Sequence, residues 1–343
     1  MMVILLIWAQ KYKFLFIVVW LLIFRAASTG HGAQHIVISC IFAAIIKKPT
    51  PMAIKESRSL SFVIITVVYR LAFAVGLLVY KGLAGSGWHY LWQLFVADAA
   101  ATVVVWLFGL LFRNVSVYDP YWSVAPPVML TLWAAHCHSW TSATLLLLVA
   151  VWYWGIRLTG NWAFTFKNLN SEDWRYTKYR NEQSPFVFHI INFFGLNMMT
   201  TVIVFLVMIP GFFVIEAAAQ ANAVCWLGFL MCITAATLQL VSDTQRHRFA
   251  KTHKGQICEV GLWKHGRHPN YFGEILMWWG VWFMYLSLCV GCGAPPTLRD
   301  LCILGPVLNT CLFRFISVPL MEKRQLQNKP GYAEYQKRTR MFI

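Results

Sequence analysis

The sequence predicts an all-α fold, a polytopic membrane helical bundle of about 8–10 transmembrane helices. Of the 343 residues, 59% are hydrophobic and only 12% are charged, whereas ordinary globular domains have about 25% charged residues. In water such a chain would expose large apolar patches, but lipid accepts helices that are apolar on every side. The 17 Trp and 13 Tyr residues are typical of the aromatic belts at bilayer interfaces.

Apolar stretches predict the positions of these helices, because a helix that crosses a bilayer needs about 20 mostly apolar residues. They lie near residues 60–82, 90–112, 124–135, 142–158, 186–210, 223–242, 270–290 and 300–320. We expect residues 60–343 to form a single membrane domain. Residues 1–59 form an apolar and basic N-terminal extension, with no acidic residue before Glu56. The sequence leaves open whether this extension is one or two membrane helices or a targeting segment.

Basic loops predict the orientation of the helices. They lie at residues 47–58, 157–180, 246–267 and 323–340, each separated from the next by an even number of expected helices. All four therefore lie on one side of the membrane, which the positive-inside rule makes cytoplasmic. The sequon at Asn114 then lies on the cytoplasmic side and is expected to stay unglycosylated.

The net charge of +16 favours contact with anionic lipid headgroups or an anionic ligand. Nucleic acid is not an expected partner, because the Lys and Arg residues lie in short loops between apolar stretches. The nine cysteines form no zinc or disulfide pattern apart from one Cys-x-x-Cys pair, Cys289 and Cys292. For this pair we favour buried small apolar side chains over metal or redox use, and we expect no metal.

The densest group of polar residues, in the segment 261–274, precedes an expected helix. Pro269 suits the first position of that helix, where its missing N–H costs nothing. The helix start would present free N–H groups to an anion, with Arg267 and His268 beside them. Several cations near one helix start suit a ligand with multiple phosphates, because arginine grips phosphate oxygens in pairs.

An acidic residue, Glu274, lies near the start of the same expected membrane helix. Asn270 and Glu274 are four residues apart and share one helical face, with Tyr271 adjacent. Gly273 would let a ligand approach the backbone closely. The alternative interpretation is an interfacial ion-pair cluster. Because we expect the acid to contact a ligand rather than the packed bundle, Glu274→Gln should abolish turnover without unfolding the protein.

These residues resemble a known family. Three features carry the resemblance: the pattern Gly-x-Trp-x-x-x-Arg-His-Pro-Asn-Tyr-Phe-Gly-Glu at 261–274, the acidic residue Glu322 just after the last expected helix (the acidic exit), and Gly-Tyr-x-x-Tyr at 331–335. Together they resemble the steroid 5-alpha-reductase C-terminal superfamily. More narrowly, they resemble its DUF1295 branch. The likeness covers roughly residues 90–343 and includes Asp119-Pro-Tyr-Trp-Ser, Arg157-Leu-Thr-Gly-Asn-Trp, Glu172-Asp-Trp-Arg-Tyr and Asp243-x-Gln.

The resemblance implies an NADPH-dependent membrane reductase in residues 60–343. It would saturate an enone-type carbon–carbon double bond of a lipophilic substrate such as a steroid, sterol or long-chain lipid. The endoplasmic reticulum is the implied membrane, and the cofactor would lie at the cytoplasmic end of the bundle. The N-terminal Glu and Tyr that bind the steroid ketone in better-known steroid reductases have no match here, so the resemblance does not extend to steroid specificity.

The resemblance also implies roles for individual residues. The implied catalytic residues are Asp119, Tyr121 and Glu274, with Tyr121 as donor to the developing enolate oxygen. The implied cofactor contacts are Asp243, Gln245, Arg248, Trp263, Arg267, His268, Asn270, Tyr271, Glu322, Tyr332 and Tyr335. The implied substrate or structural contacts are Trp122, Arg157, Asn161 and Arg175.

Two other functions remain open from the sequence. A membrane methyltransferase that uses S-adenosylmethionine, of the isoprenylcysteine carboxyl methyltransferase type, resembles this chain in the Arg-His-Pro-x-Tyr stretch and the acidic exit. The reductase is favoured because Glu274 follows the glycine and because the bases suit a phosphate-rich dinucleotide, whereas S-adenosylmethionine is cationic. The third possibility is a sterol-binding or scaffolding protein without enzymatic activity, which would fail to bind either cofactor.

Overall fold

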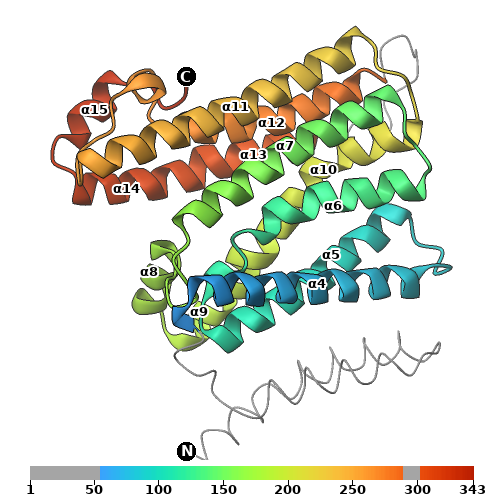
Figure 1. Cartoon of the computed structure of the whole chain (residues 1–343), viewed down its shortest axis with the longest axis horizontal. Helices are drawn as coiled ribbons and strands as arrows, with labels where there is room; N and C mark the ends of the chain where they lie inside the picture. Colours follow the sequence, from blue (N-terminus) through green and yellow to red (C-terminus); the bar gives the residue numbers. More distant parts are fainter. Residues whose placement is uncertain (1–54, 289–301) are drawn as a thin grey trace, which may run out of the picture. The chain divides into compact units, whose positions relative to one another are not determined.

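The computed structural model describes residues 55–288 and 302–343 (Figure 1). Within these ranges the chain forms helices and loops and no strand, and a single isolated β-bridge joins Gly266 to Arg340. In the part of the chain that the structure describes, six helical segments are long and apolar enough to cross a membrane: Arg58–Leu83, Tyr90–Phe112, Ser142–Thr165, Pro185–Ala217, Ala223–Thr252 and Leu304–Asn328. The predicted all-α polytopic membrane bundle is therefore confirmed. Residues 1–54 and the pair Cys289 and Cys292 lie outside the described residues.

The chain divides into two compact units, Met1–Tyr118 with Phe166–Met198 and Asp119–Thr165 with Met199–Ile343. The described helices of the first unit are α4 (Arg58–Leu83), α5 (Tyr90–Phe112), η1 (Val115–Val117), α8 (Trp174–Glu182), α9 (Pro185–Ile190) and η2 (Ile191–Met198). Ser57 caps α4 by accepting a hydrogen bond from the Leu60 amide. Small residues let α4 and α5 approach closely, since a Cβ on Gly76 would lie 3.1 Å from the Ala97 carbonyl oxygen.

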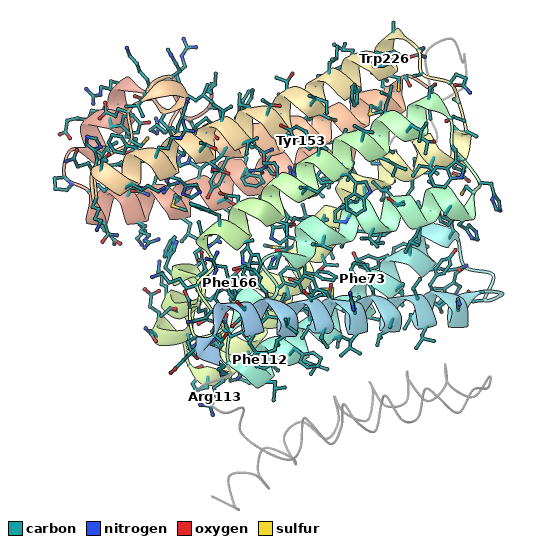
Figure 2. The ribbon with its side chains drawn as sticks, viewed as in Figure 1. Phe73, Phe112, Arg113, Tyr153, Phe166 and Trp226 are labelled. Carbon is teal, nitrogen blue, oxygen red and sulfur yellow. The ribbon has the colours of Figure 1, made fainter. Side chains whose placement is uncertain are left out.

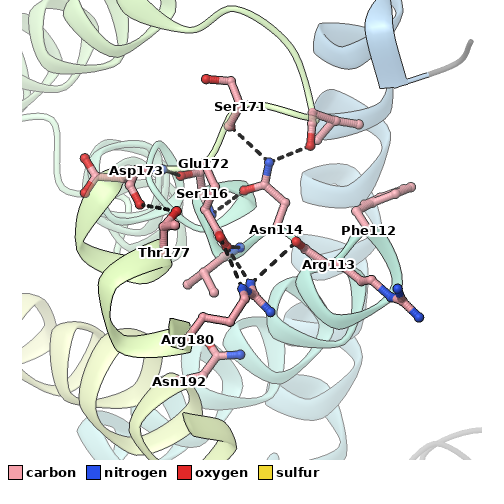
Figure 3. Close-up of polar contacts among 12 residues, drawn as sticks. Phe112, Arg113, Asn114, Ser116, Ser171, Glu172, Asp173, Thr177, Arg180 and Asn192 are labelled. Atoms are coloured by element: carbon pink, nitrogen blue, oxygen red, sulfur yellow. Dashed lines mark hydrogen bonds and ion pairs between the residues drawn. The ribbon is translucent and has the colours of Figure 1, made fainter. Parts of the chain in front are cut away.

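The loop after α5 is held by a buried asparagine (Figure 3). Asn114 is 2% exposed, and its side-chain amide donates to the carbonyl oxygens of Leu169 at 2.6 Å and Ser171 at 3.1 Å. Glu172 accepts from the Val115 amide at 2.8 Å and from Arg180 at 2.7 Å. Glycosylation of Asn114 would break these bonds, so the fold gives a reason for an unmodified sequon that does not depend on membrane orientation.

The second unit carries most of the predicted site. Its described elements are α6 (Tyr121–His136), α7 (Ser142–Thr165), α10 (Met199–Ala217), α11 (Ala223–Thr252), η3 (Gly261–Lys264), α12 (Pro269–Leu286), α13 (Leu304–Cys311), η5 (Leu312–Ser317), α14 (Val318–Asn328) and α15 (Tyr332–Arg338). Helix α11 packs along α12 and also contacts α7. Large apolar side chains lie exposed on these helices and suit contact with lipid, such as Ile156, which is 63% exposed. Trp226, which is labelled in Figure 2, is 48% exposed.

The observed helices match the expected ones in position but differ at their ends. Helix α11 continues to Thr252 rather than ending near residue 242, and the segment that ends with α14 continues to Asn328 rather than 320. Both extensions are polar, and they are helical because Asp243 and Glu322 find buried partners inside the protein. Helices α6 and α12 contain 16 and 18 residues, which is short for a bilayer-crossing helix.

Glycines set the close approach of α11 and α12. A Cβ on Gly228 would lie 2.6 Å from the Met284 amide nitrogen and 2.7 Å from the Gly280 carbonyl oxygen. No side chain can move to relieve a clash with backbone atoms, so the two helices would have to separate. The α11–α12 contact supports two of the polar helices of the site.

We therefore expect Gly228→Ala to lower the free energy of unfolding by about 1–3 kcal/mol through overpacking. Thermal unfolding can be followed by the reaction of the buried Cys225 and Cys232 with a thiol-reactive dye. Gly160→Ala on α7 is the matched control, because a Cβ there meets nothing within 4 Å. That change should stabilise the protein by about 0.5–1 kcal/mol. Equal melting temperatures for the two variants would contradict the packing argument.

Candidate functional site

A group of polar side chains lies inside the second unit on α7, α11 and α12, of which α7 and α11 are long and apolar enough to cross a membrane. Helix α7 supplies a Trp and an Arg, α11 an amide and an acid, and α12 an amide, an acid and a second Trp. This interior cluster consists of Trp154, Arg157, Gln239, Asp243, Asn270, Glu274 and Trp278. The sequence predicted Arg157, Asp243, Asn270 and Glu274 as site residues, and the structure brings these four together.

A buried ion pair joins α7 to α11. Arg157 Nη1 lies 2.9 Å from Asp243 Oδ2, and the two side chains are only 4% and 12% exposed. Arg157 Nη2 donates to Gln239 Oε1, and Asn270 Nδ2 donates to Asp243 Oδ1 at 3.2 Å. Each oxygen of the Asp243 carboxylate therefore has a donor, as a buried acid requires.

Glu274 lies between two tryptophans. Trp154 Nε1 donates to Oε2 at 2.8 Å, and Trp278 Nε1 donates to Oε1 at 2.9 Å. The two indole rings meet edge to face with centroids 4.9 Å apart. Glu274 is 6% exposed, so the expectation that it lies outside the packed bundle was wrong. The apolar character of tryptophan conceals the N–H that makes this burial possible.

This geometry changes the expected result for Glu274→Gln. The new amide must turn its NH2 group toward one of the two indole N–H donors, which leaves that donor and the amide unpaired. We expect the variant to lose about 1–3 kcal/mol of stability in addition to any activity. Glu334→Gln on the exposed side of α15 is the control and should melt with the wild type. An unchanged melting temperature in Glu274→Gln would show that a carboxylate with two acceptor oxygens is not needed here.

A second group, the cap cluster, lies where α12 begins. Arg267 Nε donates to Glu322 Oε1 at 2.6 Å, and His268 Nε2 lies 3.0 Å from the same oxygen. Gln336 donates to Glu322 Oε2 at 2.6 Å. Arg267 Nη1 also donates to the carbonyl oxygens of Gln336 and Thr339. Arg267 is 8% exposed, so its charge is taken up by an internal acid and backbone carbonyls.

The backbone amides near the start of α12 are also engaged. Those of Arg267 and His268 donate to the carbonyl oxygens of Arg340 and Met341 at 2.9 and 3.0 Å. The amide of Tyr271 is 3.0 Å from Asn270 Oδ1. Pro269 occupies the first turn of α12, as predicted, but the amides of Arg267, His268 and Tyr271 are bonded within the protein. A Cβ on Gly273 would meet the Ala235 carbonyl oxygen at 2.8 Å, so this glycine admits α11 and not a ligand.

Aromatic residues complete the cap cluster. Trp263 Nε1 donates to the Ser242 carbonyl oxygen at 2.8 Å, and the Tyr335 hydroxyl donates to the Trp263 carbonyl oxygen at 2.5 Å. The Tyr271 ring stacks on His268 with centroids 5.3 Å apart. Burial raises the pKa of the Tyr332 hydroxyl to about 12, with the nearby Glu322 acting in the same direction. Tyr332 therefore remains neutral at physiological pH.

The cap cluster should give stability a pH dependence. Burial lowers the pKa of His268 from its ordinary value, and this effect outweighs the opposing hydrogen bond with Glu322. The unfolded chain then binds more protons than the folded protein below about pH 6.5, so stability is lost as the pH falls through that range. We expect the melting temperature of the wild type to fall between pH 7.5 and 5.5, and to fall less in His268→Gln. Parallel pH profiles for the two proteins would contradict the neutral state of His268.

The remaining predicted residues take several positions. Gln245 Oε1 accepts from the Leu262 amide at 2.9 Å, and the Asn161 side chain lies 2.8 Å from His247 Nε2. Arg248 is exposed on α11. Arg175 belongs to the first unit, where it pairs with Asp173 at 2.8 Å.

The predicted substrate-side residues lie at the start of α6. Asp119 precedes this helix and is partly buried, while Tyr121 is 1% exposed. The Trp122 ring packs against Trp154 with centroids 6.1 Å apart. This contact connects the start of α6 to the indole that holds Glu274.

Gln239, Trp154 and Trp278 were not predicted from the sequence as site residues. Helical spacing was the signal that could have found two of them, because Gln239 lies four residues before Asp243 and Trp278 four residues after Glu274. The described residues contain no group of three or more His, Cys, Asp and Glu side chains that could hold a metal ion.

Exposed basic residues lie on the last turns of α11 and on the segment that follows it. Arg246 lies over the Trp263 ring at 5.3 Å. The exposed bases on the following turn and loop are Arg248, Lys251, Lys254 and Lys264. Their charges fit a phosphate-bearing cofactor better than Arg267 does, because that guanidinium is already bound to Glu322.

Comparison with known proteins identifies similar sequences. A family model described as a protein of unknown function (DUF1295) matches residues 105–339. An uncharacterized protein of Schizosaccharomyces pombe is 20% identical over 266 residues, which span 70% of this chain and 75% of that protein. No solved structure matches the chain.

Proposed function

The chain belongs to the DUF1295 family, and we propose that it is an NADPH-dependent membrane reductase related to the steroid 5-alpha-reductases. The proposed reaction saturates an enone-type carbon–carbon double bond in a lipophilic substrate such as a steroid, sterol or long-chain lipid. We also propose that the protein resides in the endoplasmic reticulum with its basic loops in the cytoplasm, as the positive-inside rule favours.

The interior cluster is the observation that supports an enzymatic function. It holds an arginine and two acids, Asp243 and Glu274, on apolar membrane helices. A buried ion pair rarely stabilises a fold more than apolar residues of the same size would. Ionisable residues inside membrane helices therefore indicate function more often than stability.

Different residues of the chain have different roles in the proposed reaction. When bound, NADPH supplies the hydride that adds to one carbon of the double bond. Asp243 and Asn270, which contact each other at 3.2 Å, would hold the cofactor near its reactive end, and the exposed bases after Asp243 would hold its phosphates. Tyr121 is buried at the start of α6, and we assign to it the role of hydrogen-bond donor to the enolate oxygen that develops as the double bond is reduced.

Cofactor binding by the detergent-purified protein tests this proposal. Thermal shifts with NADPH, NADH and S-adenosylmethionine would be compared in the wild type and in Arg248→Ala. Lys167→Ala, an exposed base of the first unit, is the matched control. Arg267→Ala is unsuitable, because that side chain holds the cap cluster together and its loss would change the melting temperature without any ligand.

We expect NADPH to raise the melting temperature, and we expect Arg248→Ala but not Lys167→Ala to weaken this effect. Stabilisation by S-adenosylmethionine alone would replace the reductase with a methyltransferase. No stabilisation by any of the three would favour a sterol-binding or scaffolding protein. With NADPH binding established, oxidation of NADPH at 340 nm in the presence of enone lipids would test turnover.

A further inference from the structure

Two hydrogen-bond donors in the interior cluster have no partner among the described residues. They are Arg157 Nε and Gln239 Nε2, and both atoms are buried. Arg157 is 7% exposed and Gln239 is 1% exposed. The two side chains contact each other directly, since Arg157 Nη2 donates to Gln239 Oε1. The unpartnered donors therefore belong to one bonded pair on facing helices, α7 and α11.

The acceptors of the same cluster are satisfied. Both oxygens of Asp243 accept hydrogen bonds, from Arg157 and Asn270. Both oxygens of Glu274 accept hydrogen bonds from indole N–H groups. The cluster thus has a surplus of donors, and inside a membrane bundle an unsatisfied donor costs considerable free energy. A ligand that complements it must bring an acceptor.

The charges around the pair select the kind of acceptor. Asp243 and Glu274 both lie in the cluster and act electrostatically on Arg157, so a carboxylate or phosphate would be repelled by any charge they carry. A neutral carbonyl oxygen has two lone pairs and meets no such repulsion. It could accept from both donors at once.

We propose that Arg157 and Gln239 form a subsite for a carbonyl oxygen. This inference rests on the proposed function, in which the oxygen belongs either to the carbonyl conjugated with the double bond or to the carboxamide of the nicotinamide. Both donors keep their protons, and no covalent step takes place at the pair. Charge that develops on a substrate oxygen during reduction is stabilised by the guanidinium in a dry site.

Gln239→Glu is the sharpest variant for a test. It keeps an oxygen for Arg157 and replaces only the unpartnered NH2 group with an acceptor. Gln239→Met, which removes the polar group altogether, is the second variant and cannot regain a donor by protonation. Gln183→Glu at the exposed end of α8 is the control. The melting temperature of each unliganded variant is measured first, so that a failure to fold is recognised.

The probes are matched pairs with and without the carbonyl. Cholest-4-en-3-one is compared with cholest-4-ene, and hexadec-3-en-2-one with hexadec-3-ene, each with and without NADPH. We expect at least one enone to bind the wild type with an apparent affinity at least tenfold higher than its alkene. Both Gln239 variants should abolish this difference, while Gln183→Glu retains it and alkene binding stays the same.

The arms of the experiment separate the two sources of the oxygen. If the variants weaken the enone but not NADPH, the oxygen is the substrate's, whereas weakened NADPH binding identifies the carboxamide. Enone-selective binding without NADPH binding would leave the subsite standing and remove the reductase proposal. If enones and alkenes bind alike and NADPH affinity is unchanged in both variants, the donors hold no more than water and the subsite is wrong.

Discussion

Arg157→Met is expected to lower the free energy of unfolding by about 3–5 kcal/mol, because it removes one partner of a buried ion pair. Asp243 would keep only its bond from Asn270, and Glu274 would lose the opposing charge of Arg157. Two buried acids would then lack the guanidinium that acts on both of them. Methionine nearly matches the length of the arginine stem, so little of the loss would come from a cavity.

The first unit offers a matched control with the same two residue types. Arg175 and Asp173 lie 2.8 Å apart, but their side chains are 40% and 27% exposed. Arg175→Met should therefore cost about 0–1 kcal/mol, since water already screens that pair. The double variant Arg157→Met with Asp243→Asn should recover part of the loss. Chemical denaturation in mixed micelles would measure all four proteins, and equal losses for Arg157→Met and Arg175→Met would refute the buried pair.

The helices could be predicted from the sequence because their cause is local. A stretch of about 20 apolar residues must be helical in lipid, since no water satisfies its backbone. The starts of α4, α5 and α7 fall within two residues of the expected positions. The ends of α11 and α14 were missed, because polar residues extend these helices only when distant acids and bases satisfy them.

The sequence predicted which residues belong to the candidate site, but not which of them bond to one another. Arg267 beside a helix start is a plausible anion site as long as no acid is near, and Glu322 lies 55 residues away in sequence. The same holds for Glu274, whose partner Trp154 is 120 residues distant. Sequence patterns report which residues are unusual for a membrane helix, but the three-dimensional fold decides which of them neutralise one another.

The two polar clusters meet on the first turns of α12. His268 bonds to Glu322 at the cap, and Asn270 bonds to Asp243 of the interior cluster. A cofactor that contacts Asp243 and Asn270 would therefore lie next to a rigid anchor. The cap cluster then serves to fix the start of α12, so that the side chains one turn further along are held in place for binding.

Arg267→Met should test this anchoring role and is the second change with a large expected effect. It leaves Glu322 with His268 and Gln336 as partners and frees the carbonyl oxygens of Gln336 and Thr339. We expect a loss of about 3–5 kcal/mol. Limited proteolysis should cleave the C-terminal residues 336–343 sooner than in the wild type, because their contacts with the start of α12 would open first.

Arg338→Met provides the control, since Arg338 pairs with Glu259 in the same region while its side chain is 61% exposed. It should leave both the melting temperature and the proteolysis rate close to those of the wild type. If Arg267→Met also behaves like the wild type without ligand but loses NADPH binding, the guanidinium belongs to the cofactor and not to the anchor. If the variant is less stable without ligand but still binds NADPH, the phosphates of the cofactor are bound by the exposed basic residues after Asp243.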